Sequence, residues 1–191
     1  MDKLKNKTAY HEAGHAIIAF YHRLKLGSIS IIEDPDKDSR GKVQFRQFGT
    51  DEFHLEALID SILAGRAVEL KLLGDKAQNG WIFSDLNKAI DAALIIHDKF
   101  YKDRSDDGFG NVEYVDHLNQ IKNQILEDDN DYLWDLESNA NMFYDDHGQH
   151  IEELVNREHI WNCIVHLANI LIDKKVMNQD ELIEVIQSIW K

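Results

Sequence analysis

The stretch TAYHEAGHAIIAF, residues 8–20, constrains the fold of this chain more than any other feature. Over residues 4–24, apolar side chains recur at helical spacing and cover most faces, so the segment predicts a buried helix that ends near Gly27. His11 and His15 lie one turn apart on one face of that helix. The helix must therefore be surrounded by other elements, and its two imidazoles are either satisfied core groups or metal ligands.

The other periodic segments predict a mainly α-helical fold with a small β-hairpin or sheet next to this first helix. Further helices are expected at 52–73 and 151–172, and Gly65 in the first of these indicates a close helix–helix approach. Another helix should follow an N-cap at Ser84, and the last should follow Asn178, whose capping box includes Glu181. The β-rich runs SISII (28–32) and KVQF (42–45) predict the hairpin.

Length and composition favour one domain over residues 1–191, because 191 residues with 43% hydrophobic content can form one sizeable core but hardly two. Thirteen acidic and two basic residues fall between residues 103 and 146, which predicts an acidic helical excursion there. Cys163 is the single cysteine. Any metal site must therefore use His, Asp or Glu, and we expect Cys163 to be a buried small hydrophobe.

The formal net charge of −14 argues against nucleic acid and anionic membranes as partners, because both repel a carboxylate-rich surface. The N-terminus contains no apolar signal region, and no run approaches about 18 apolar residues. A cytoplasmic protein without a membrane segment is expected.

The spacing of HEAGH fits a zinc site, since His11 and His15 can point at one ion. Glu12 is rotated about 100° around the helix and can act on a water molecule there as a general base. Helix rise excludes His22, which would lie about 10 Å or more from both histidines. A third ligand must come from elsewhere; Glu69, Asp85 and His97 are the candidates, and spacing alone leaves that choice open.

Three ordered segments resemble the FtsH-type zinc peptidase domain: TAYHEAGHAIIAF, LIDSILAGRAVELKLLG and FSDLNKAIDAALIIHDKF. The C-terminal tract NREHIWNCIVHLANILIDKKVMNQDELIEVI is similar to that domain's closing helices. The resemblance implies a helical zincin-like peptidase that binds Zn²⁺ through His11, His15 and Asp85, with Glu12 as the catalytic base. It favours Asp85 over Glu69, and it implies an extended polypeptide substrate held at the edge of the β element.

The chain departs from that family in its N-terminal part and at one loop. Ten residues precede His11 and no GxxxxGK(S/T) motif occurs, so we expect an ATP-independent, standalone peptidase, with a separate ATPase as a possible partner. IFSDL also replaces the usual TGAxNDL-like loop before the third helix.

Homo-oligomerisation is possible by analogy with the family's rings. The alternatives are a metal-stabilised non-catalytic interaction module or a regulatory protease of narrow specificity.

Overall fold

The computed structural model describes residues 6–33, 41–47, 51–74, 83–101, 112–127, 143–144 and 148–190. These residues are mainly helical and include one small antiparallel sheet, which confirms the predicted fold class. Within these ranges, no helix combines the length and the apolar character needed to cross a bilayer.

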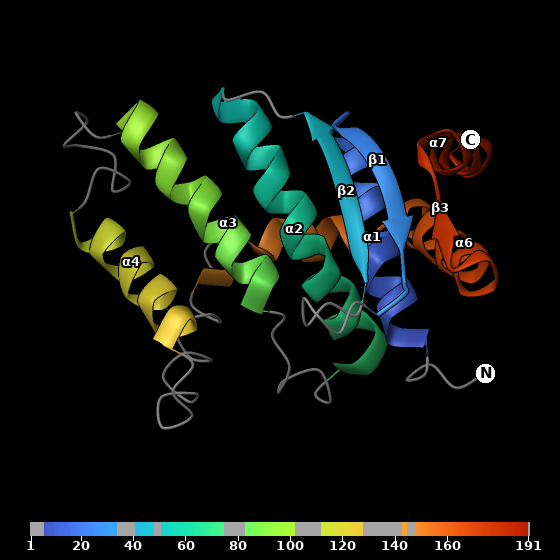
Figure 1. The fold of residues 1–191 in the computed structure, drawn as a ribbon, viewed down its shortest axis with the longest axis horizontal. Coiled ribbons are helices and arrows are strands. Elements are labelled where there is room, and N and C mark those ends of the chain that lie inside the picture. Colours follow the sequence, from blue (N-terminus) through green and yellow to red (C-terminus); the bar gives the residue numbers. More distant parts are fainter. Residues whose placement is uncertain are drawn as a thin grey trace.

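Helix α1 (Lys7–Tyr21) lies at the centre of the fold, and every residue from Ala9 to Ala19 is buried. It packs on α2 (Glu52–Leu73), on α6 (Glu158–Lys174) and on the sheet. Figure 1 shows α1 behind the sheet, with α2 beside it. Burial on nearly all sides follows from the apolar residues around the whole circumference of the helix.

The predicted end of the first helix near Gly27 is wrong, because the chain turns sooner. Arg23 has a positive φ of 61°, and the N–H of Leu24 donates to the carbonyl of Ala19 at 2.9 Å, which reverses the chain after Tyr21. Gly27 instead lies inside strand β1 (Lys25–Ser30). A Cβ at Gly27 would lie 3.0 Å from the carbonyl oxygen of Gln44, so glycine allows the neighbouring strand to approach there.

The sheet has the strand order β2-β1-β3, with both pairings antiparallel. The predicted hairpin is confirmed as β1 with β2 (Lys42–Gln47), although β1 begins three residues before SISII and its register shifts around Gly27. The third strand, β3 (Val176–Met177), was not predicted from the sequence. It pairs with the end of β1, and β2 lies at the opposite edge of the sheet.

Three helices form a layer beside the sheet, in the order α2, α3 (Phe83–Ile96) and α4 (Val112–Glu127) (Figure 1). The predicted third helix is confirmed as α3, which continues into a π-helical turn, η4 (His97–Tyr101). The predicted N-cap at Ser84 is wrong, because α3 already begins at Phe83 and Ser84 lies inside its first turn. Of the expected acidic excursion at 103–146, the structure describes α4 and residues 143–144; the rest lies outside the described residues.

The C-terminal part contains one correction and one confirmation. A single helix over 151–172 is wrong: residues 148–156 are helical, but Arg157 is extended with a ψ of 129°, and α6 begins at Glu158. The capping box before α7 (Gln179–Ile189) is confirmed, since Asn178 accepts the N–H of Glu181 and Glu181 accepts the N–H of Asn178.

Glycine allows α1 and α2 to approach closely. A Cβ placed on Gly14 would lie 2.8 Å from Val68 Cγ2 and 3.0 Å from the backbone oxygen of Ala64. The oxygen belongs to a helix backbone and cannot move away alone. Any side chain at position 14 would therefore push apart α1, which carries His11 and His15, and α2, which carries Glu69 and Gly65.

We expect Gly14→Ala to destabilise the metal-free protein by ~1–3 kcal/mol through overpacking, although Ala in a helix interior normally stabilises by ~1 kcal/mol over Gly. Urea unfolding in the presence of a chelator measures the effect without a contribution from metal. Asn162→Ala, at an exposed position of α6, is the control and should leave stability unchanged or slightly higher. A Gly14→Ala protein as stable as the parent would contradict the close approach.

Candidate metal centre

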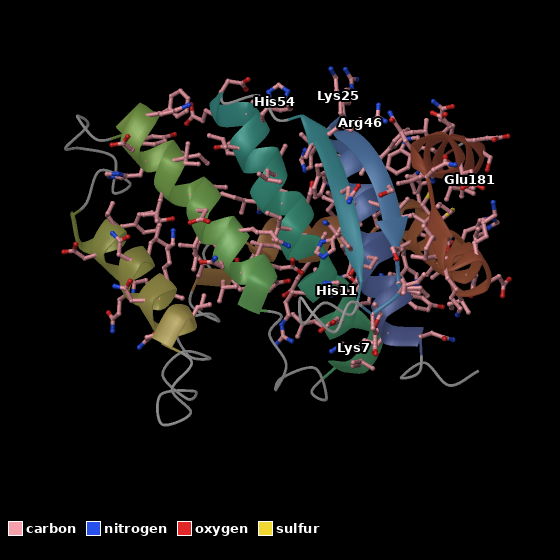
Figure 2. All side chains as sticks on the ribbon, in the orientation of Figure 1. Lys7, His11, Lys25, Arg46, His54 and Glu181 are labelled. Carbon is pink, nitrogen blue, oxygen red and sulfur yellow. The ribbon has the colours of Figure 1, made fainter. Side chains whose placement is uncertain are left out.

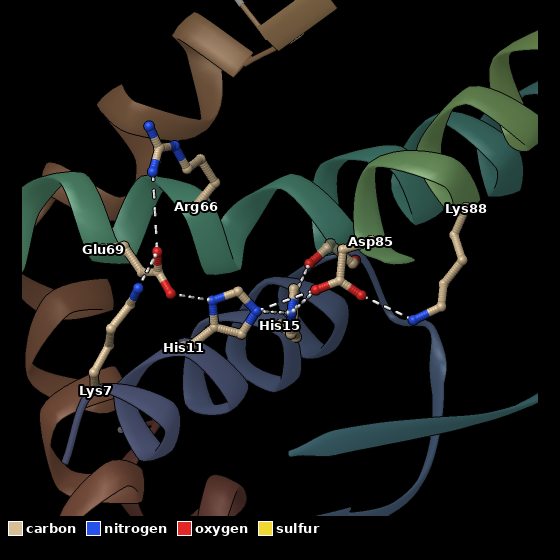
Figure 3. A network of polar contacts seen from close by, with 8 residues as sticks. Lys7, His11, His15, Arg66, Glu69, Asp85 and Lys88 are labelled. Carbon is tan, nitrogen blue, oxygen red and sulfur yellow. Dashed lines mark hydrogen bonds and ion pairs between the residues drawn. The ribbon is translucent and has the colours of Figure 1, made fainter. Parts of the chain in front are cut away.

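Side chains from α1 and α3 bring three potential ligand atoms together in the interior. The Nε2 atoms of His11 and His15 are 2.9 Å apart, and Asp85 Oδ2 lies 3.1 Å from the first and 3.3 Å from the second. Figure 3 shows Asp85 reaching toward both imidazoles from the start of α3. These three residues form a group that could hold a metal ion.

The other ring nitrogen of each histidine has a partner that fixes its proton. His15 Nδ1 lies 2.7 Å from the backbone oxygen of Ser61, which can only accept, so this nitrogen carries hydrogen and donates. His11 Nδ1 donates to Glu69 Oε1 at 3.0 Å. A histidine whose Nδ1 carries the hydrogen presents the lone pair of Nε2, as metal-binding histidines do.

Three acceptor atoms therefore face one another, and they need a positive charge between them. Two donor atoms about 2.0–2.1 Å from a tetrahedral zinc ion are about 3.3–3.4 Å apart, so the observed separations of 2.9 to 3.3 Å need only a small expansion. In the absence of metal a proton on His11 supplies this charge: burial lowers the pKa of His11, but the hydrogen bonds to Asp85 and Glu69 outweigh burial and raise this pKa to about 10. A bound metal ion would replace that proton. The site thus attracts a cation, and its residues fit zinc.

The carboxyl group of Asp85 is held in the ionised form that a ligand requires. Burial raises its pKa, but the hydrogen bonds from His11 and His15 prevail and hold the pKa well below its usual range. Its second oxygen, Oδ1, accepts a bond from Lys88 Nζ at 2.8 Å (Figure 3). Asp85 can therefore offer one oxygen to a metal while the lysine holds the other.

Glu69 lies behind His11, on the side away from Asp85. Burial raises the pKa of its carboxyl group, but the hydrogen bond with His11 and the charge of Lys7 outweigh burial, so the pKa is lowered. Lys7 Nζ lies 3.0 Å from Glu69 Oε2, and the Arg66 guanidinium is 4.0 Å from the same oxygen. The structure thus places Glu69 against Nδ1 of His11 and brings Asp85 to the two Nε2 atoms.

The other histidines considered lie outside this cluster. His22 Nε2 lies 2.9 Å from Asp60 Oδ2. This agrees with the conclusion from helix rise that His22 is too far along α1 to bind an ion together with His11 and His15. His97 lies in η4 and lines a separate cavity of about 320 Å³ together with Asp60 and Tyr101. The walls of that cavity include none of the three potential ligands.

Glu12 follows His11 on α1 and is 5% exposed. Burial raises the pKa of its carboxyl group, while the charges of His15 and His11 act in the opposite direction. A Cβ on Gly41, the residue before β2, would lie 2.5 Å from Glu12 Oε1. The backbone at Gly41 therefore covers this carboxyl group closely, and only glycine leaves room for it.

Gly65 makes the corresponding space for the histidines. A Cβ there would lie 2.6 Å from Cε1 of His11 and equally close to Cε1 of His15. The sequence predicted a close approach at Gly65, and the structure shows that the approaching groups are the two imidazoles.

Sequence reasoning did not find three groups that support the site: the Ser61 carbonyl, Lys7 and Gly41. Glycine before the strand KVQF was the available signal for Gly41. The Ser61 carbonyl gives no signal in the sequence, because every residue has a backbone carbonyl.

No family model matches the chain. It is 34% identical over 91 residues to the ATP-dependent zinc metalloprotease YME1L of Drosophila melanogaster, an FtsH-type protein. The similarity covers 45% of this chain and 12% of the length of that relative. The chain thus has distant similarity to the peptidase region of an FtsH-type metalloprotease.

We expect Asp85→Ala to abolish stoichiometric zinc binding and Glu69→Gln to weaken it about 10- to 100-fold, as loss of a supporting partner does. Isothermal titration with zinc and metal analysis after dialysis measure both effects. Ser188→Ala, at an exposed position of α7, is the control and should bind like the parent. Loss of metal in Glu69→Gln alone would show that Glu69 is the third ligand.

Gly65→Ala is expected to weaken zinc binding about five- to 100-fold without removing any ligand atom, because overpacking of ~1–3 kcal/mol displaces the imidazoles. Gly74→Ala is the control at the end of the same helix: an added Cβ meets nothing within 4 Å there, although the positive φ of 56° makes this substitution costly in stability. That control should keep the zinc affinity of the parent. Equal affinity in both variants would contradict a role for Gly65 in placing the histidines.

Proposed function

We propose that this chain is a zinc-dependent endopeptidase that acts on unfolded or flexible polypeptide. The observation that carries the proposal is the convergence of His11, His15 and Asp85 on one point. The buried carboxyl group of Glu12 lies on the same helix as the two histidines. Distant similarity to a zinc metalloprotease supports this choice of chemistry.

The ligands in this proposal are Nε2 of His11, Nε2 of His15 and one oxygen of Asp85. Three protein ligands leave one position open on a tetrahedral ion, which is the arrangement of catalytic rather than structural zinc sites. When bound, zinc supplies Lewis acidity, which lowers the pKa of a water molecule and polarises a peptide carbonyl.

Glu12 serves as the general base and then as the general acid. Its carboxylate accepts a proton from the attacking water and delivers it to the nitrogen of the leaving amine. Burial raises the pKa of this carboxyl group, which makes the carboxylate a stronger base and helps it hold the proton between the two transfers.

Glu69 and the Ser61 carbonyl keep the two imidazoles in the required orientation. Each accepts the Nδ1 hydrogen of one histidine, so neither ring can rotate without breaking a buried hydrogen bond. Lys7 in turn holds Glu69 through its second oxygen. The ligands are therefore preorganised before any substrate enters.

The substrate in this proposal is an extended segment beside β2. This strand lies at an edge of the sheet, and Gly41, which directly precedes it, lies against Glu12. A peptide that adds to this edge as a further strand would present its backbone carbonyls alongside the site. Such binding uses main-chain hydrogen bonds and requires the substrate to be locally unfolded.

Glu12→Gln is expected to lower the hydrolysis of a casein-type unfolded substrate by at least about 100-fold, as expected for loss of a general base. Zinc content should remain one ion per chain, because Glu12 is not a ligand. Fluorescence release from labelled casein measures hydrolysis, with metal analysis of the same preparation. Glu153→Gln, on the helical residues 148–156, is the matched control and should keep full activity.

Two results would argue against the proposal. Hydrolysis that survives in Glu12→Gln would show that the activity does not use this carboxylate. A zinc-loaded parent protein that cleaves no unfolded substrate, yet loses melting temperature on chelation, would identify a metal-stabilised interaction module instead.

A further inference from the structure

Strand β2 presents a basic face to solvent beside the site. Along the strand, Lys42, Gln44 and Arg46 are exposed, and they alternate with the half-buried Val43 and Phe45, which pack on the core. This alternation is the period of two that places successive side chains on opposite faces of a sheet. Lys42 and Arg46 therefore lie on the same face, four residues apart; we call this pair the basic strip.

Neither cation of the basic strip is in an ion pair within the described part of the chain; Gln44 between them accepts a hydrogen bond from Ser28 at 2.9 Å. Lys25 of β1 lies near Arg46 at the same end of the sheet (Figure 2). The chain as a whole has 35 acidic and 21 basic residues. Two unpaired cations on one short strand are therefore a local reversal of the charge of the molecule.

The position of the basic strip links it to the site. Lys42 directly follows Gly41, whose backbone lies against the carboxyl group of Glu12. Among the described residues, no strand pairs with β2 on the side opposite β1. A peptide strand added there would place alternate side chains about 4.5–5.5 Å from those of β2 on the same face.

We propose that the basic strip selects acidic polypeptide segments, so that the peptidase prefers substrates with Asp or Glu at two positions four residues apart, opposite Lys42 and Arg46. This inference rests on the proposed function for the reaction, but its binding step can be tested without hydrolysis. Opposite charges directly across two strands stabilise the pairing, whereas like charges destabilise it. Basic segments are correspondingly disfavoured.

The test uses three unstructured peptides of one sequence, with Glu, Ser or Lys at the two positions four residues apart. Binding to the zinc-loaded Glu12→Gln protein is measured by fluorescence anisotropy, and hydrolysis by the parent is measured as kcat/KM. We expect the Glu peptide to exceed the Lys peptide about five- to 20-fold in both measurements at low salt. The difference should shrink markedly near 1 M salt, where the screening length is about 3 Å.

Charge reversal in the double variant Lys42→Glu, Arg46→Glu is expected to invert the order, so that the Lys peptide binds best. Arg157→Glu, an exposed arginine between two helical segments outside the sheet, changes charge in the same sense and should preserve the order of the parent. Inversion by both variants would show an effect of net charge and would overturn the assignment to the basic strip.

The outcomes separate this inference from the proposed function. Cleavage of all three peptides at equal rates, with equal binding, would overturn the acidic preference and leave the peptidase intact. No cleavage of any peptide, but preferential binding of the Glu peptide that is lost in the double variant, would overturn the peptidase and retain the acidic binding site.

Discussion

The close contact between α1 and α2 is the constraint on which the rest of the site depends. At its centre stand two glycines, Gly14 on one helix and Gly65 on the other, and a Cβ on either would overlap atoms of the facing helix. The space left by Gly65 is filled by the imidazoles of His11 and His15. Helix packing and ligand placement are thus one arrangement, because the histidines are part of the interface between the helices.

The electrostatics of the buried cluster follow from that arrangement. Three carboxyl groups, those of Glu12, Glu69 and Asp85, surround two imidazoles in a region from which water is largely excluded. Such a cluster is costly unless it is compensated, and two lysines at its ends supply part of the positive charge. A cation between the three facing ligand atoms would supply the rest of the positive charge.

The part of the site that lies on α1, and some details of the helices, could be predicted from local sequence, because the features involved are local. The spacing of His11 and His15, the exclusion of His22 and the capping box at Asn178 depend on helix geometry that a few residues determine. The choice between Asp85 and Glu69 could not be made from spacing, because it depends on how two other helices pack on α1. Resemblance to a family favoured Asp85, and the packing places it beside both Nε2 atoms.

The errors in the predicted fold also arise from interactions between segments that are distant in the sequence. The turn at Arg23 requires a positive φ, which arginine rarely adopts, so the sequence does not mark the turn. The apolar periodicity continues past the true end of α1 and therefore predicts a longer helix. The extended residue Arg157 interrupts an otherwise helical pattern without a proline or glycine to mark it. Strand β3 has two residues and exists only because β1 lies next to it. In each case tertiary context outweighs local preference.

The two histidines differ in how they withstand substitution. His11 depends on one side chain, because the carboxylate of Glu69 accepts its Nδ1 hydrogen. His15 instead bonds to the backbone of Ser61, whose own hydroxyl donates to the carbonyl of Ala57. The imidazole of His15 can lie against the Ser61 carbonyl because Gly65, one turn later, has no Cβ; a Cβ there would lie 2.6 Å from Cε1 of that ring. Loss of the Ser61 side chain would therefore leave the acceptor of His15 in place, whereas loss of the Glu69 side chain would remove the acceptor of His11.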